Sequence, residues 1–178
     1  MVTKYKFLVP TAVVMVTALA LASCDSSDGN HAAVPANSTA RTASLNAYTP
    51  EQGSTPLTSC NIETLDNTVF AVQPSHATTV QTHSLSGWIA SPHVHDPKYW
   101  LRFDDKSANR YFEIPVTPSL KRPDVAAVAG NEAFPIDTGF TANVPVSALP
   151  AGEYHVYLAA IDGTAVYACD NGRQIIFK

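Results

Sequence analysis

Apolar and polar residues alternate with a period of two in several short stretches of the chain. The clearest stretches, in which every second residue is apolar, are 85–89, 99–104, 140–146 and 154–158. Side chains on a β-strand point alternately to its two faces, so this period predicts strands with one buried face. Further strands are expected at 68–72, 110–116, 164–169 and 174–177, where β-branched and aromatic residues gather.

Turn-forming pairs separate these stretches. They are Asp104-Asp105, Asp162-Gly163 and Asn171-Gly172, and the sequences Asp-Gly and Asn-Gly favour tight hairpins. One helix is expected at residues 122–130, with a proline near its start and a glycine at its end. About seven or eight short strands with one short crossover helix predict an all-β fold, an immunoglobulin-like Greek-key sandwich.

The chain divides into a tether and one folded domain. Residues 25–58 are rich in Ser, Asn, Ala, Thr, Pro and Gly and nearly lack large apolar side chains. Such a segment buries too little surface to offset its ordering entropy. We therefore expect a flexible stalk over residues 24–58 and a single sandwich domain over residues 59–178, which is long enough for one core.

The first residues have the pattern of an export signal. Lys4 and Lys6 precede an apolar run, residues 7–22, that contains no charged residue. This run is about as long as a signal-peptide core and is short for a helix that crosses ~30 Å of hydrocarbon. It ends in Leu21-Ala22-Ser23-Cys24, which resembles the lipobox of bacterial lipoproteins. The alternatives are an ordinary secretory signal and a single membrane-spanning helix.

The lipobox resemblance implies that residues 1–23 are removed and that Cys24 carries a lipid. Acyl chains contribute ~0.8 kcal/mol per buried CH₂, so several chains would hold the protein on a membrane. Asp25 follows the cysteine, and an aspartate there resembles the inner-membrane retention signal of enterobacterial lipoproteins. We expect a lipid-anchored protein on the periplasmic side of the inner membrane, with the outer membrane as the alternative.

The net charge argues against nucleic acid as a partner. The chain has 11 Lys and Arg against 15 Asp and Glu, and without the two lysines of residues 1–23 the net charge is −6. Nucleic-acid binding needs basic clusters that neutralise phosphates, and Lys121-Arg122 is the only adjacent basic pair. We expect neither a nucleic-acid partner nor a cofactor.

Two cysteines remain after Cys24 is assigned to lipid. Cys60 and Cys169 are an even pair in an oxidising compartment, so we expect a disulfide between them. They lie near the two ends of the domain, and closing a loop of ~100 residues is worth ~4–5 kcal/mol in the chain-entropy model. The alternative is a free catalytic cysteine, but no neighbouring residue indicates an activated thiol.

Several short motifs follow one another toward the C-terminus. They are Arg122-Pro123-Asp124-Val125, then Gly139-Phe140, then Leu149 and Gly152 before a strand. The pattern is similar to that of small bacterial Ig-like domains, which occur beside glycan-handling enzymes and on envelope proteins; the resemblance implies a sandwich and no particular activity. Tyr154 resembles the tyrosine corner of Greek-key sandwiches, in which the hydroxyl bonds back to upstream backbone.

The segment His93-Val94-His95-Asp96 is the most suggestive of metal chemistry. Residues two apart on a strand point the same way, so the two histidines could share a metal, with Asp96, His83 or His155 as a third ligand. Two prolines bracket the segment and indicate a solvated loop instead. We assign no metal site and keep His93 and His95 as the candidates.

Hydrolytic chemistry has little support in the sequence. No serine stands in the G-x-S-x-G context of a nucleophile elbow. Asp104-Asp105 could be a paired-carboxylate site, but the pair lies where a hairpin turn is expected. We therefore expect that the protein is not an enzyme.

Aromatic residues fall on both faces of the expected strands, at Trp88, Tyr99, Trp100, Tyr111, Tyr157 and Tyr167. Those that point outward can stack on sugar rings or anchor a protein contact; alternatively, both faces are covered. Trp88, Trp100 and Tyr157 are the candidate binding residues.

These features predict a membrane-anchored envelope lipoprotein that presents an Ig-like binding or accessory module to a protein or glycan. One alternative is an immunity or exclusion lipoprotein that blocks a toxin or a phage. The other is a metal-dependent hydrolytic enzyme that uses His93 and His95.

Overall fold

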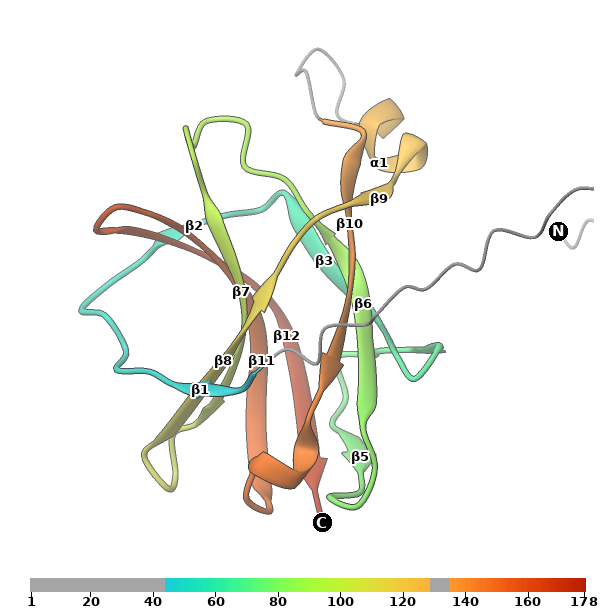
Figure 1. The fold of residues 1–178 in the computed structure, drawn as a ribbon, viewed down its shortest axis with the longest axis vertical. Coiled ribbons are helices and arrows are strands. Elements are labelled where there is room, and N and C mark those ends of the chain that lie inside the picture. Colours follow the sequence, from blue (N-terminus) through green and yellow to red (C-terminus); the bar gives the residue numbers. More distant parts are fainter. Residues whose placement is uncertain (1–43, 129–134) are drawn as a thin grey trace, which may run out of the picture. The chain divides into compact units, whose positions relative to one another are not determined.

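The computed structural model describes residues 44–128 and 135–178; Cys24 and the expected signal peptide lie outside them. The described residues form two β-sheets, of seven and five strands, in a sandwich-like arrangement with one short α-helix. Figure 1 shows the two layers, with β7, β8, β11 and β12 in one and β3, β6 and β10 in the other. The prediction of a mostly β domain with one short helix is confirmed.

The seven-stranded sheet has the order β1 (Asn46–Ala47), β8 (Arg110–Val116), β7 (Lys98–Asp105), β11 (Gly152–Asp162), β12 (Ala165–Phe177) and β2 (Thr55–Pro56), and β5 (Ser75–Ala77) also pairs with β12. The five-stranded sheet has the order β4 (Thr68–Val69), β3 (Cys60–Leu65), β6 (His83–Ile89), β10 (Asp137–Val144) and β9 (Leu120–Lys121). The helix α1 (Pro123–Val128) connects β9 to β10, and a 3₁₀ turn, η1 (Val146–Ala148), follows β10. Among the described residues, no helix is both long and apolar enough to span a membrane.

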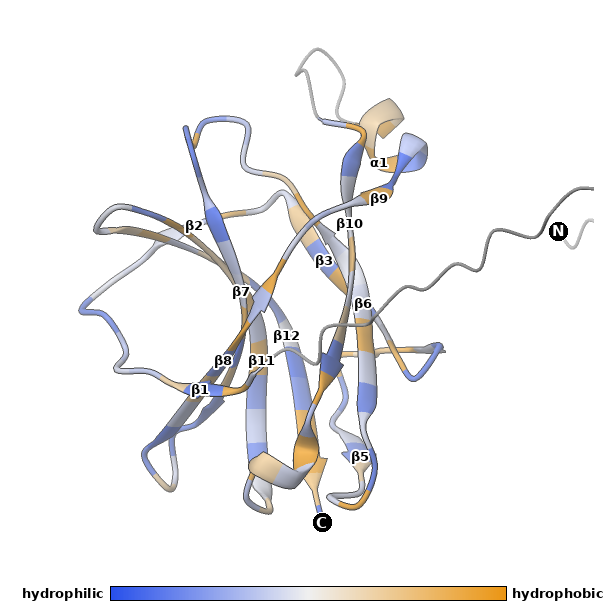
Figure 2. Ribbon diagram, viewed as in Figure 1, coloured by the Kyte–Doolittle hydropathy of each residue, from blue (hydrophilic) through white to orange (hydrophobic). Residues whose placement is uncertain are grey.

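The period-two pattern places the core between the two sheets. Leu85, Gly87 and Ile89 of β6 are buried, and the residues between them are half-buried. Figure 2 shows apolar and polar residues alternating along the strands in this way. A Cβ added at Gly87 would lie 2.1 Å from the carbonyl oxygen of Asn61, so glycine permits the close approach of β3 where its pairing with β6 shifts register.

The expected disulfide between Cys60 and Cys169 is confirmed, with the two Cα atoms 6.2 Å apart. Cys60 lies on β3 and Cys169 on β12, so the bond joins the two sheets. The two cysteines are separated by 109 positions, so the bond closes most of the domain.

Of two expected turns that contain glycine, the structure confirms one and contradicts the other. Gly163, with φ +58°, and Thr164 form the two-residue loop between the paired residues Asp162 and Ala165, which confirms the hairpin. The turn expected at Asn171-Gly172 is wrong. Both residues lie inside β12, at a bulge where the register with β11 shifts, and Gly172 has φ +67°. Glycine in a left-handed conformation serves a bulge as well as a turn.

This bulge connects β12 to the other sheet. The backbone N–H of Ile62 donates to the Asn171 side chain at 3.3 Å, and Arg173 Nε donates to the Ile62 carbonyl oxygen at 3.2 Å. The two side chains therefore satisfy backbone groups on the edge of β3 that faces away from β6.

Two local motifs lie where the sequence places them. The Tyr154 hydroxyl donates to the carbonyl oxygen of Pro150 at 2.9 Å, and the Tyr154 side chain is fully buried. This is the backward contact expected of a tyrosine corner. The helix α1 falls within the expected range 122–130, of which residues 129 and 130 lie outside the described residues.

The structure moves the expected start of the folded domain. Residues 44–58, expected in the stalk, pack on the seven-stranded sheet: β1 pairs with β8, and β2 pairs with β12. Leu45 and Leu57 contact the core. The domain therefore includes residues 44–58, because these leucines and Tyr48 supply apolar surface that the average composition conceals.

Candidate functional site

Residues 48–54, here called the strap, cross the outer face of the seven-stranded sheet between β1 and β2 (cyan in Figure 1). At one end, the Tyr48 N–H donates to the carbonyl oxygen of Tyr111 on β8 at 3.1 Å. Beyond the other end, the Leu57 N–H donates to the carbonyl oxygen of Ala168 on β12 at 2.9 Å. The chain is thus fixed near both edges of the sheet.

Arg102 of β7 binds the strap from the outer face of the seven-stranded sheet. Its side chain is only 3% exposed, and its two terminal nitrogens each donate to a Glu51 carboxylate oxygen at 2.8 Å. Its Nε donates to Glu113 at 3.0 Å, and the guanidinium lies 4.1 Å from the centre of the Tyr48 ring. A buried charge is tolerated only with such partners, so Arg102 and the strap stabilise each other.

The two carboxylates beside Arg102 experience different environments. Hydrogen bonds from Arg102 hold the pKa of Glu51 below its ordinary value of 4.5. Burial raises the pKa of Glu113, and the attraction of Arg102 offsets this only in part. Two carboxylates share one guanidinium, so none of the positive charge of Arg102 is left for a ligand.

A second set of contacts fixes the strap through hydroxyl groups. The Tyr48 hydroxyl donates to Asp104 Oδ1, and it lies 2.8 Å from the hydroxyl of Tyr157. Because Tyr48 uses its only proton on Asp104, Tyr157 must donate to Tyr48. Burial raises the pKa of both tyrosines, and for Tyr48 the hydrogen bond to Asp104 raises it further. Both phenols therefore keep their protons.

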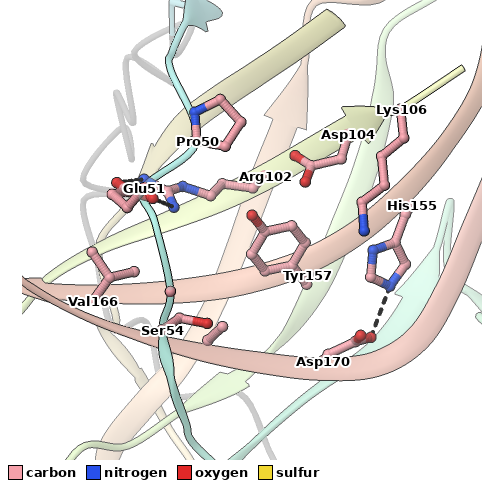
Figure 3. A pocket seen from close by; sticks show the side chains of 12 residues that line it. Pro50, Glu51, Ser54, Arg102, Asp104, Lys106, His155, Tyr157, Val166 and Asp170 are labelled. Atoms are coloured by element: carbon pink, nitrogen blue, oxygen red, sulfur yellow. Dashed lines mark hydrogen bonds and ion pairs between the residues drawn. The ribbon is translucent and has the colours of Figure 1, made fainter. Parts of the chain in front are cut away.

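A groove of about 250 Å³ opens beside the strap (Figure 3). We call it the strap groove. Its floor comes from β7, β11 and β12, and the register of β11 with β7 places His155 opposite Asp104 and Tyr157 opposite Arg102. The His155 ring stacks on the Tyr157 ring, with centroids 5.5 Å apart and an interplanar angle of 27°.

The bulge of β12 supplies the remaining wall of the groove. Asp170 stands at the bulge and accepts a hydrogen bond from the Gly172 N–H at 2.7 Å. The same oxygen, Oδ1, lies 2.8 Å from His155 Nε2, as the dashed line in Figure 3 shows. Bulges commonly redirect a side chain in this manner; here the bulge directs Asp170 toward the groove.

Three polar groups of the strap groove have hydrogen-bonding capacity to spare. Asp104 and Asp170 each use only Oδ1, so within the described residues the second oxygen, Oδ2, of each carboxylate has no partner. Lys106 lines the same groove. Its ammonium makes no hydrogen bond or ion pair with residues 44–128 or 135–178.

The three aromatic candidates do not form one site. Tyr157 lies in the strap groove. Trp100 lines a second cavity of about 450 Å³ with Glu51 of the strap and Lys98. Trp88 lies on the other sheet, where it lines a cavity of about 390 Å³ with Arg122 and Val125. The structure therefore brings Tyr157 and Trp100 to the strap and separates Trp88 from them.

The histidines considered as metal ligands lie in three different parts of the domain. His93 and His95 lie in the loop between β6 and β7, as the flanking prolines indicate, and Asp96 lines the Trp100 cavity. His83 lies at the other end of β6 and contacts Asp66 at 2.5 Å. His155 is held by Asp170. No group of three or more potential metal ligands occurs in the described part of the chain.

Asp104 and Asp105 are not a paired-carboxylate site. Asp104 binds Tyr48 of the strap. Asp105 accepts hydrogen bonds from the Ser107 hydroxyl at 2.6 Å, from the Ala108 N–H at 3.0 Å and from Arg110. It therefore stabilises the turn between β7 and β8, in agreement with the expected hairpin.

The sequence interpretation did not identify Glu51, Arg102, Lys106 or Asp170. Arg102 is a polar position within the alternating stretch 99–104, and the strap lies within the segment that is expected to be a stalk. One signal was present, because Tyr48 is the only Phe, Trp or Tyr between residues 25 and 58. A single aromatic residue in a segment of small residues indicates a contact point.

Comparison of the chain with protein-family models, with curated proteins and with solved structures gives no match.

Proposed function

We propose that this protein is a membrane-anchored envelope lipoprotein, lipidated at Cys24, whose sandwich domain binds an envelope protein or glycan through the strap groove and catalyses no reaction. The observation that carries the proposal is the set of available polar groups in the groove. Two carboxylate oxygens, on β7 and β12, and the ammonium of Lys106, in the turn after β7, lie beside an aromatic ring, and convergent polar groups of this kind fix the orientation of a bound ligand.

Binding is favoured over catalysis by the contacts of His155. Ser54 lines the same groove as His155 and Asp170, so the three residue types of a hydrolytic triad are present. However, within the described residues Ser54 makes no hydrogen bond to His155. A nucleophile needs such a bond to its base, so this arrangement supports a ligand site.

We further propose that the sandwich has immunoglobulin-like Greek-key topology. Strands β7 and β8 form a hairpin, as do β11 and β12, and the connections from β6 to β7 and from β10 to β11 pass between the sheets. The bond from Tyr154 to Pro150 at the start of β11 also supports this topology. In such a sandwich, loops and sheet faces are free to bind partners while the core stays unchanged.

Photo-crosslinking in cells tests the proposed binding surface. A photoreactive residue replaces Lys106 at the strap groove in the full-length protein, and a matched variant carries it at the exposed Lys121 on β9 of the other sheet. We expect an envelope adduct at position 106 that Tyr157→Ala weakens. The absence of any adduct, or identical adducts at both positions, would contradict the proposal.

The proposed anchor has a separate test. Cys24→Ser removes the thiol that would receive the lipid, so an unlipidated or uncleaved precursor should accumulate. If this variant fractionated with membranes as the same mature species as the wild type, the lipoprotein assignment would be wrong.

A further inference from the structure

The strap groove combines charges of both signs with an aromatic ring, and this combination restricts the chemistry of its ligand. We propose that the ligand is a neutral, hydroxyl-rich ring, such as a pyranose residue of a glycan. The inference rests on the proposed binding function and specifies the class of ligand at the same site.

The charges of the groove disfavour a charged ligand. The carboxylates of Glu51 and Glu113 neutralise the single positive charge of Arg102. The remaining charges are the carboxylates of Asp104 and Asp170 and the ammonium of Lys106. An anionic group would be repelled by the two carboxylates, whereas a cationic group could pair with a carboxylate but would leave the ammonium of Lys106 without an acceptor. Charges that a partner leaves unmatched cost affinity, so a neutral ligand suits this mixture best.

The free hydrogen-bonding groups fit hydroxyls. A carboxylate oxygen only accepts and an ammonium only donates, and the groove offers both through Oδ2 of Asp104, Oδ2 of Asp170 and Nζ of Lys106. A hydroxyl can donate to the first kind of group and accept from the second. A ring with several hydroxyls can therefore satisfy both kinds of group, whereas an amine or a carboxylate satisfies only one kind.

Tyr157 offers the apolar part of the contact. Figure 3 shows its ring in the middle of the groove, with Lys106, His155 and Asp170 toward one side and Glu51 of the strap toward the other. The hydroxyl bond to Tyr48 and the stacking on His155 fix the orientation of the ring. Aromatic faces bind apolar ring surfaces, and a ring held in advance loses little entropy on binding.

The size of the groove limits the bound part of the ligand. Its volume of about 250 Å³ is below the ~300–1,000 Å³ typical of pockets that enclose drug-sized molecules. Gly53 and Ser54 of the strap and Ala168 of β12 line it, so small side chains create the space. The groove thus accepts one ring-sized group, either a chain end or one residue of a longer glycan.

Saturation-transfer NMR on the full mature protein tests the inference with two sets of probes. One set consists of neutral oligosaccharides of glucose, mannose and N-acetylglucosamine, and the other of matched oligosaccharides that contain uronic acids. We expect transfer to neutral probes only. We also expect Tyr157→Ala or Asp170→Asn to weaken binding about tenfold, equivalent to ~1.4 kcal/mol. Trp88→Ala, on the other sheet, is the control and should leave affinity unchanged.

The possible outcomes separate the inference from the proposed function. Binding of uronic-acid probes alone, lost in Lys106→Gln, would overturn the neutral class but keep the groove as a binding site. A crosslinked protein adduct at position 106 without binding of any saccharide would also overturn the inference and keep the proposed function. Saccharide binding that Trp88→Ala abolishes and Tyr157→Ala does not would overturn both.

Discussion

Two arginines of the domain, Arg102 on β7 and Arg122 between β9 and α1, each bind two carboxylates. Arg102 binds Glu51 and Glu113 at 2.8–3.0 Å. Arg122 binds Glu63 and Asp124 at 2.6–3.0 Å. The contacts are alike, but the side chain of Arg102 is 3% exposed and that of Arg122 is 20% exposed, because the strap covers Arg102 while Arg122 lies at the surface beside α1.

The comparison shows that burial determines how much an ion pair contributes to the stability of the fold. Two unit charges 4 Å apart interact by about 1 kcal/mol in water and about 4 kcal/mol at an effective dielectric constant of 20. Exposed pairs therefore add ~0–1 kcal/mol, whereas removing one partner of a buried pair leaves a charge without compensation. We expect the strap to make Arg102 structurally essential and to leave Arg122 nearly dispensable.

The largest loss of stability is expected when the disulfide that joins the two sheets is removed. Replacing Cys60 and Cys169 by alanine should lower the free energy of unfolding by ~3–4 kcal/mol, because the open chain gains entropy in the unfolded state. Urea unfolding followed by circular dichroism measures the loss. Hydrogen exchange should rise on the strap side and on the α1 side alike. Exchange that rises on one side only would mean that the bond supports a single sheet.

The second-largest effect is expected when Arg102 and Arg122 are each replaced and the losses of stability are compared. Arg102→Met should cost ~2–3 kcal/mol, because Glu113, only 13% exposed, loses its partner. Arg122→Met should cost ~0.5 kcal/mol, since its partners remain in contact with water. Equilibrium unfolding of both variants under one set of conditions provides the test. Equal losses would show that the strap does not change the local environment.

A smaller effect is expected in the pH dependence of stability, where Glu51 and Glu113 act in opposite directions. The folded pKa of Glu51 is lowered, so its contribution is fully present above the ordinary value of 4.5 and is lost as the pH falls through the folded pKa. Glu113 has a raised pKa and acts in the opposite direction, because protonation relieves its burial.

Glu51→Gln isolates the first of these two effects. The variant should be less stable than the wild type by under ~1 kcal/mol at neutral pH, a small value because Glu51 is 37% exposed. The difference should shrink as the pH is lowered below the ordinary value of 4.5. Urea midpoints over a pH series test this. A difference that grows in acid would reverse the assigned sign.

The smallest expected effect on stability is that of Lys106→Gln. Lys106 has no hydrogen bond or ion pair within the described residues, so the free energy of unfolding should change by less than ~0.5 kcal/mol. Thermal melting of the variant and of Lys121→Gln, as the surface control, should give the same temperature within error. A clear loss confined to Lys106→Gln would assign this lysine a structural role.

Local patterns in the sequence predict much of the fold. The alternation in β6 and β11, the Asp162-Gly163 hairpin and the contact of Tyr154 all depend on residues close in the chain. The Cys60–Cys169 bond is distant, but the count of cysteines leaves one pairing once Cys24 is assigned to lipid. These features follow from period, turn chemistry and redox compartment.

The strap groove could not be predicted in the same way. Its key contact joins Glu51 to Arg102 across 51 positions, and a period-two pattern gives the direction of a side chain but not what covers it. The bulge that directs Asp170 uses Asn171-Gly172, a pair equally suited to a hairpin. Composition also concealed the strap, because a few anchoring residues lie among many small polar ones.

The central claim is that the strap groove, and not the outer face of the five-stranded sheet, is the binding surface. Hydrogen-exchange mass spectrometry of the lipidated protein, with and without a solubilised envelope extract, tests it most directly. The account predicts increased protection in peptides from the strap and from residues 102–106 and 155–157. Protection confined to β6 and α1, around Trp88, or no change in any peptide, would contradict it.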